Sequence, residues 1–275
     1  MELVLGDLAA QLERPQTQKF AWPIVLLPEL FATPRHLAIL CGYLVGIGWE
    51  VYVLDAHPRK ARAPADSAAP GSAFAGTLDR LRQALAAIGS DVVVVGHGLG
   101  GAFALKAAEH PPVRAAIALA PLVPGFRSPL FVREPGALAF WRSASTGPPA
   151  GRELFELVAD ADAFQREQII KSLAAAETSA AMELARGEVE FARPQTPSLI
   201  VAGGSDLFAP HPRTEQLAHR IGARLVTLDG RGHWLIAGRI LERAVAEMQR
   251  FLVRSFGEEL LLLYSDNWGG GSGNS

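Results

Sequence analysis

Six short apolar runs alternate with helical segments along this chain, and that alternation restricts the possible fold more than any other feature. The runs are four to seven residues long, rich in branched aliphatic side chains and nearly uninterrupted by polar ones. A strand that is buried on both faces has such a continuous apolar run, whereas a half-exposed strand alternates. The expected strands are residues 23–27, 51–54, 91–95, 113–119, 197–202 and 224–228.

Segments with apolar residues at helical spacing separate these strands. The expected helices are residues 34–48, 74–88, 101–110, 213–222 and 240–256, and residues 57–72 are expected to form a long loop. Strands that alternate with helices favour parallel pairing through right-handed crossovers. The prediction is an α/β fold with a mostly parallel central sheet and helices on both faces.

One block interrupts the alternation. Residues 124–194 contain no clear strand, begin with a stretch rich in proline and glycine, and contain helical segments near 153–164 and 165–176. Insertions after parallel strands lie where ligands bind, so a helical lid (or cap) is expected, with an inert extension as the alternative. The expected organisation is a core of residues 1–123 and 195–264, the cap 124–194, and a flexible, glycine-rich tail 265–275. The apolar run at 260–264 is expected to dock on the core.

Composition excludes several classes of function. The chain has 275 residues, 49% of them hydrophobic, and a net charge of -2, which argues against a nucleic-acid partner. Cys41 is alone, so neither an internal disulfide nor a cysteine-based metal site is expected. There is no basic leader and no run of eighteen uncharged apolar residues, so we expect a cytoplasmic protein without a membrane partner. The oligomeric state is not readable from these features.

A glycine-rich turn follows the strand expected at 91–95. It reads Gly96-His97-Gly98-Leu99-Gly100-Gly101 and leads directly into a helix, so the chain turns sharply there. The same letters match the G-x-G-x-x-G pattern of dinucleotide sites. The turn lies in mid-chain, however, and residues 115–122 offer no acid for a ribose, so no nucleotide or other cofactor is expected.

Two later strands run into loops that carry an acid and a histidine. Residues 203–206 read Gly-Gly-Ser-Asp, and residues 229–234 read Asp-Gly-Arg-Gly-His-Trp. With the glycine-rich turn, these loops make the chain resemble the α/β-hydrolase superfamily over about residues 20–256. The resemblance implies that Asp206 is the acid, His233 the base, and Gly98 the residue at the nucleophile position, where the family carries serine.

A glycine at that position rules out an acyl-enzyme formed through residue 98. Loss of the serine from a catalytic triad costs on the order of a millionfold in kcat. By the same resemblance, the backbone N–H groups of Leu99 and Leu30 are expected to form the oxyanion hole. The family's usual His-Gly pair is replaced by a stretch that contains Glu29, which either faces outward or serves as an acid/base group in a remodelled pocket.

The other candidate site residues surround this turn. His97 is expected to pack beside it, and a small-molecule substrate would bind under the cap. The candidate binding residues are Glu29, His97, Phe126, Phe140, Trp141 and Trp234.

Three functions remain open. The leading hypothesis is an enzyme for a small apolar ester-, thioester- or carbonyl-type molecule. In it, a neutral His233 oriented by Asp206 acts as general base for water activation, lyase, isomerase or cyclase chemistry. The second is a catalytically silent pseudoenzyme that binds a ligand. The third is a serine ester or thioester hydrolase whose nucleophile has become Gly98, and it predicts that Gly98→Ser restores ester hydrolysis.

Overall fold

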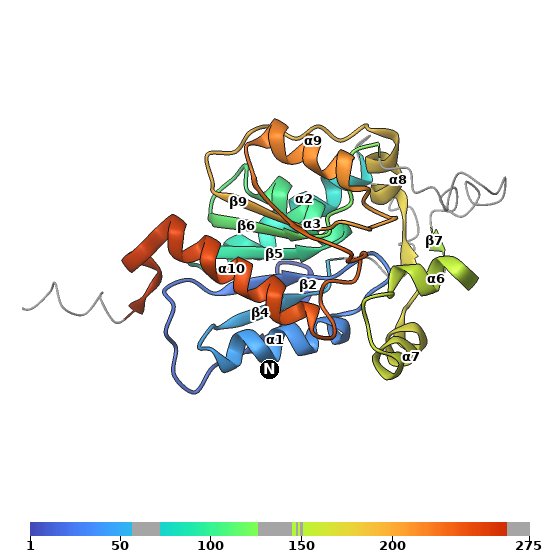
Figure 1. The fold of residues 1–275 in the computed structure, drawn as a ribbon. Helices are drawn as coiled ribbons and strands as arrows, with labels where there is room; N and C mark the ends of the chain where they lie inside the picture. The colour runs from blue at the N-terminus through green and yellow to red at the C-terminus, as the bar shows by residue number, and fades with distance from the viewer. Residues whose placement is uncertain (57–71, 126–144, 147, 149–150, 263–275) are drawn as a thin grey trace, which may run out of the picture.

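An eight-stranded sheet forms the centre of the molecule. The computed structural model describes residues 1–56, 72–125, 145–146, 148 and 151–262, and the strand order is β1-β2-β4-β3-β5-β6-β9-β10 (Figure 1). Strands β3 to β10 of this sheet pair in parallel. The bounds are β1 Glu2–Leu5, β2 Leu8–Glu13, β3 Ile24–Leu27, β4 Val51–Leu54, β5 Val92–His97, β6 Val113–Leu119, β9 Ser198–Gly203 and β10 Arg224–Leu228. The predicted fold class and all six predicted strands are confirmed.

Helices cover both faces of the sheet. Figure 1 shows α1 and α10 on one face and α2 and α3 on the other. The bounds are η1 Pro34–Leu37, α1 Ala38–Gly46, α2 Ala73–Ile88, α3 Leu99–Ala107, α9 His211–Ile221, α10 Ile240–Phe256 and η2 Gly257–Leu260. Each predicted helix is present with shifted ends. Leu260 is fully buried, so the expected docking of the last apolar run is confirmed there, whereas the predicted tail and most of the 57–72 loop lie outside the described residues.

The N-terminal hairpin formed by β1 and β2 was not predicted. Strand β2 pairs antiparallel with β1 and with β4, so the hairpin adds two strands to the edge of the sheet. Its residues Leu8, Ala10 and Leu12 are buried and alternate with exposed ones. This period of two indicates a half-exposed strand, and a search for continuous apolar runs misses it.

The described part of the insertion contains helices, but its details differ from the prediction. It contains α6 Gly151–Leu157, α7 Ala163–Ser172 and α8 Ser179–Arg186, together with a two-residue strand pair, β7 Ser145–Thr146 and β8 Ala176–Glu177. No clear strand was expected in residues 124–194, and β7 and β8 correct this expectation. Each of these strands has two residues, which is too few to leave a periodic pattern in the sequence. Asp162 caps α7 by accepting a hydrogen bond from the backbone of Gln165, which breaks the helix expected at 153–164. No described helix is long and apolar enough to cross a membrane.

The insertion is attached to the core by a side chain. The carboxylate of Glu183, on α8, accepts hydrogen bonds from the backbone N–H groups of Ala73 and Phe74 at the start of α2. These N–H groups belong to the first turn of a helix and have no partner within it. The contact therefore fixes α8 against the core.

Gly203, at the end of β9, lies against the loop that follows β10, and we predict that this position does not tolerate a side chain. A Cβ on Gly203 would lie 2.0 Å from the carbonyl oxygen of Gly232, which is backbone and cannot rotate away. Gly203→Ala should lower the free energy of unfolding by about 1–3 kcal/mol. Gly42→Ala on α1, where nothing lies within 4 Å of an added Cβ, is the control and should be neutral or stabilising. Urea unfolding measures both, and equal stability of the two variants would contradict the prediction.

Candidate active site

Four loops bring the candidate catalytic residues together at one edge of the sheet. Glu29 follows β3, Gly98 follows β5, Asp206 follows β9 and His233 follows β10. These strands are parallel, so their carboxyl ends meet at the same edge. Residues separated by up to 204 positions are therefore in direct contact.

Gly98 forms the turn between β5 and α3. Its backbone angles are φ 55° and ψ -116°, a region that residues with a Cβ rarely adopt. The turn is held by the carbonyl oxygen of Gly98, which accepts hydrogen bonds from the N–H groups of Ala102 and Leu122. The predicted sharp strand-to-helix turn is confirmed.

Glu29 points into the centre and is almost fully buried. Its Oε2 lies 2.8 Å from Nε2 of His233. Its Oε1 accepts hydrogen bonds from the backbone N–H groups of Leu30 (2.6 Å) and Leu99 (3.2 Å). Of the two alternatives for Glu29, the outward-facing one is therefore wrong, because three donors hold its carboxylate inside. The two N–H groups expected to form an oxyanion hole converge on one oxygen atom.

The Glu29 carboxylate takes the space that a side chain at residue 98 would need. An ideal Cβ built on Gly98 would lie 1.2 Å from Oε2 of Glu29. A serine at residue 98 and the observed position of Glu29 are therefore mutually exclusive.

Asp206 holds the opposite side of the His233 ring. Its Oδ2 lies 2.8 Å from Nδ1 of His233. Its Oδ1 accepts hydrogen bonds from the N–H groups of Phe208 (2.7 Å) and Ala209 (2.9 Å). The expected contact between Asp206 and His233 is present, and both ring nitrogens face carboxylates.

The two carboxylates determine the charge of the ring. Burial lowers the pKa of His233, but Asp206 and Glu29 outweigh it and raise the pKa to about 10. Burial raises the pKa of Glu29, but the hydrogen bond and charge of His233 outweigh it and lower the pKa to about 2. His233 is therefore an imidazolium at neutral pH. The expectation of a neutral His233 is corrected for this state of the site.

His97 and Trp234 pack beside this charged group. Nε2 of His97 lies 2.8 Å from the carbonyl oxygen of His233 and donates to it when the ring is neutral. Burial, followed by the charge of His233, lowers the pKa of His97 to about 4. The rings of His97 and Trp234 are 5.1 Å apart, edge to face. The packing role predicted for His97 is supported, because its ring holds the backbone of the histidine loop.

Trp234, the residue after His233, also lines a cleft, whereas Glu29, Gly98, Asp206 and His233 do not line it. The cleft has a volume of about 450 Å³ and lies between η1, α7 and the residues that follow Trp234. Its walls are largely apolar, including Ile39, Phe164 and Ile169. Phe126, Phe140 and Trp141, the other aromatic candidates, lie outside the described residues.

Asp160 is a contact that the sequence did not reveal. It lies in the turn after α6, and its Oδ1 and Oδ2 lie 3.1 and 3.0 Å from the backbone nitrogen of Gly232. The insertion therefore holds the residue that precedes His233. No motif or spacing marks Asp160, because the contact joins residues 72 positions apart in different parts of the fold.

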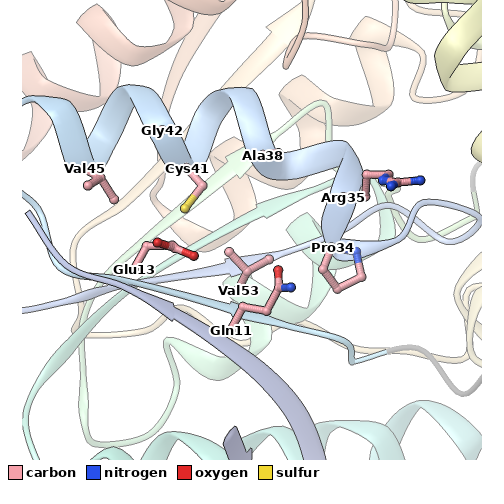
Figure 2. Close-up of a pocket in the computed structure, with 9 residues that line it drawn as sticks. All are labelled: Gln11, Glu13, Pro34, Arg35, Ala38, Cys41, Gly42, Val45 and Val53. Atoms are coloured by element: carbon pink, nitrogen blue, oxygen red, sulfur yellow. The ribbon is translucent and has the colours of Figure 1, made fainter. Parts of the chain in front are cut away.

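Cys41 lies elsewhere, in a cavity of about 200 Å³ between α1 and strands β2 and β4 (Figure 2). Burial raises the pKa of its thiol to about 11, so it is a poor nucleophile at neutral pH. The side chain is buried. Within the described part of the chain, no group of three His, Cys, Asp or Glu side chains is arranged to hold a metal ion.

The comparisons with known proteins agree with this fold. The model of the alpha/beta hydrolase family matches residues 18–246. The chain belongs to this family. No curated protein matches it by sequence.

Solved alpha/beta hydrolases share the fold at low identity. A monoglyceride lipase from Saccharomyces cerevisiae is 14% identical with a TM-score of 0.69, covering 90% of this chain and 92% of its own. A monoacylglycerol lipase from Paleococcus ferrophilus is 18% identical with a TM-score of 0.64, covering 88% and 98%. A thermophilic esterase from Thermogutta terrifontis is 17% identical with a TM-score of 0.60, covering 93% and 98%. Identities this low establish the fold alone.

We predict that the free energy of unfolding is highest near pH 6.5. The raised pKa of His233 means that its contribution is complete below pH 6.5 and is lost as the pH rises towards 10. The lowered pKa of His97 costs stability as the pH falls from 6.5 to 4, and that of Glu29 costs stability from 4.5 to 2. Urea unfolding at a series of pH values measures this profile.

The matched variant for this profile is Glu29→Gln. The amide keeps the volume but removes one carboxylate, so the pKa of His233 falls, and the alkaline loss becomes smaller and is complete at a lower pH. Superimposable alkaline limbs for the two proteins would show that Glu29 does not hold the proton on His233.

We also predict that Gly98→Ser alone does not restore ester hydrolysis. The new Cβ collides with Glu29, so this variant should be less stable and inactive on p-nitrophenyl esters. Glu29→Ala combined with Gly98→Ser removes the collision and should exceed Gly98→Ser in rate by at least about a hundredfold. The single variant Glu29→Ala is the control, because it shows any gain in hydrolysis rate that does not depend on the new serine. Full activity of Gly98→Ser would mean that Glu29 moves aside freely.

Proposed function

We propose that this alpha/beta hydrolase acts on a small apolar ester, thioester or other carbonyl compound without forming an acyl-enzyme. One observation carries the proposal. The N–H groups of Leu30 and Leu99 converge on a single oxygen, Oε1 of Glu29, while Nε2 of His233 contacts the other oxygen of the same carboxylate. Acyl chemistry needs this arrangement: two donors for the carbonyl oxygen and a proton-transferring group beside the carbonyl carbon.

The proposed reaction begins when Glu29 leaves the centre. The substrate's carbonyl oxygen then takes the place of Oε1 between the two N–H groups. As the Glu29 carboxylate moves away, the pKa of His233 falls, and the ring gives its Nε2 proton to Oε2 of Glu29, which carries it to solvent. The neutral ring is then able to accept another proton. Because Gly98 has no side chain, a water molecule fits beside Nε2, where the family's serine would stand.

The proton balance of direct hydrolysis is closed within this set of residues. The water oxygen attacks the carbonyl carbon as one of its hydrogens passes to Nε2 of His233, and the two N–H groups stabilise the oxyanion. His233 then donates that proton to the leaving alcohol or thiol as the bond to it breaks. Asp206 stabilises the imidazolium in between. Proton abstraction from a carbon next to the carbonyl would use the same groups.

The similar solved structures support the substrate class. A monoacylglycerol lipase, a monoglyceride lipase and an esterase are among them, and these enzymes act on esters. The apolar cleft beside Trp234 fits an apolar substrate. The second candidate function, a silent binding protein, is favoured by a different observation: Glu29 occupies every donor of the centre in this structure.

Asp206→Asn tests the proposal, because it keeps the shape of the Asp206 side chain and removes its charge. The purified protein should hydrolyse members of a panel of short p-nitrophenyl esters, thioesters and lactones. Asp206→Asn should reduce kcat by about 10⁴-fold. Asp79→Asn, an exposed position on α2, is the matched control and should leave the rate unchanged. Mass spectrometry during turnover should detect no acylated protein.

Two results would overturn the proposal. If the wild-type chain converts no member of the panel although it binds ligand, the silent candidate is supported. If Asp206→Asn turns over as fast as the wild type, hydrolysis does not use His233 in the proposed way. Unfolding curves for all variants separate loss of activity from loss of fold.

A further inference from the structure

We propose that the centre is a carboxylate-binding site and that Glu29 is its built-in occupant, which a ligand with a carboxylate group displaces. This inference names the class of ligand that binds at the site proposed above to be catalytic. It rests on the proposed function in one respect, because it takes this centre as the place where substrate or product binds.

Three donors define the site, and they come from three different loops. Leu30 N–H and Leu99 N–H donate to one oxygen, and Nε2 of His233 contacts the other. A planar group with two acceptor oxygens satisfies all three donors at once. Leu99 is also the first residue of α3, where the helix dipole favours negative charge.

No acceptor in the described contacts competes for these donors. Asp206 lies on the far side of the His233 ring and uses its second oxygen for the N–H groups of Phe208 and Ala209. Gly98 presents no side chain. Without the Glu29 carboxylate, the centre would therefore contain two buried N–H groups and a His233 Nε2 without partners, which is costly until a carboxylate enters and restores the contacts that Glu29 makes.

The covalent attachment of the Glu29 carboxylate to the chain explains how it limits the binding of free carboxylates from solution. The carboxylate is covalently attached next to its own site, so its effective concentration is millimolar or more. A free carboxylate competes poorly unless the rest of the molecule makes further contacts. The ligand expected for the intact protein is accordingly an acid, or an ester that yields one, with an apolar body.

Acetate is the probe that matches the tethered group. Truncation of Glu29 to alanine removes one CH₂ and the carboxylate, which together have nearly the atoms of acetate. Acetate should bind Glu29→Ala at least tenfold more tightly than it binds the wild type. NMR titration should show shifts of the Leu99 amide and of the His233 ring in Glu29→Ala.

Two controls make the result specific. Glu29→Gln keeps the volume filled by an amide and should bind acetate no better than the wild type. Sodium chloride at equal ionic strength should not reproduce the shifts. If Glu29→Ala is unfolded alone, the measurement becomes whether acetate, and not chloride, restores its folded circular-dichroism spectrum.

Acetate binding to Glu29→Ala that is no stronger than to Glu29→Gln, or that chloride matches, would overturn the inference. A different result would contradict the proposed function. Acetate binding by Glu29→Ala, combined with no turnover by the wild type on any carbonyl substrate, would keep the carboxylate site and remove the catalytic proposal. Turnover without acetate binding would do the reverse.

Discussion

The carboxylate of Glu29 is the group on which the rest of this centre depends. It joins two backbone N–H groups and the imidazolium of His233 in a space with almost no solvent access. Buried charges are costly unless they are paired and hydrogen-bonded. Here the pairing extends over three side chains, because His233 lies between Glu29 and Asp206 and each carboxylate accepts two backbone hydrogen bonds as well.

This arrangement links two departures from the usual alpha/beta hydrolase pattern. By the resemblance described above, Gly98 lies at the family's serine position, and Glu29 lies in the stretch where the family's His-Gly pair is expected. Taken separately, each looks like the loss of a catalytic part. In the structure the two are sterically linked, because a Cβ on Gly98 and Oε2 of Glu29 would occupy the same space. The glycine is thus what allows the carboxylate to reach His233.

Local patterns were sufficient for most of the fold. The continuous apolar runs located the six parallel strands, and the glycine-rich turn located the bend at Gly98. The alternating pattern of β2 was present in the sequence but overlooked. The short β7–β8 pair and the contact of Asp160 with Gly232 had no signal, because they depend on residues that are distant in the chain.

The residue types and their order along the chain were enough to place Asp206 and His233 after neighbouring strands and to predict that residue 98 forms no acyl-enzyme. They left the direction of Glu29 open, since an acid beside a glycine-rich turn fits either solvent or the interior. That direction, and with it the protonation of His233, follows from the packing of four strand ends, which aims three hydrogen-bond donors at one carboxylate. Hydrogen bonds and desolvation act over a few ångströms in space. The charge of His233 is therefore determined by groups up to 204 residues away in the chain, and its neighbours in the sequence do not determine it.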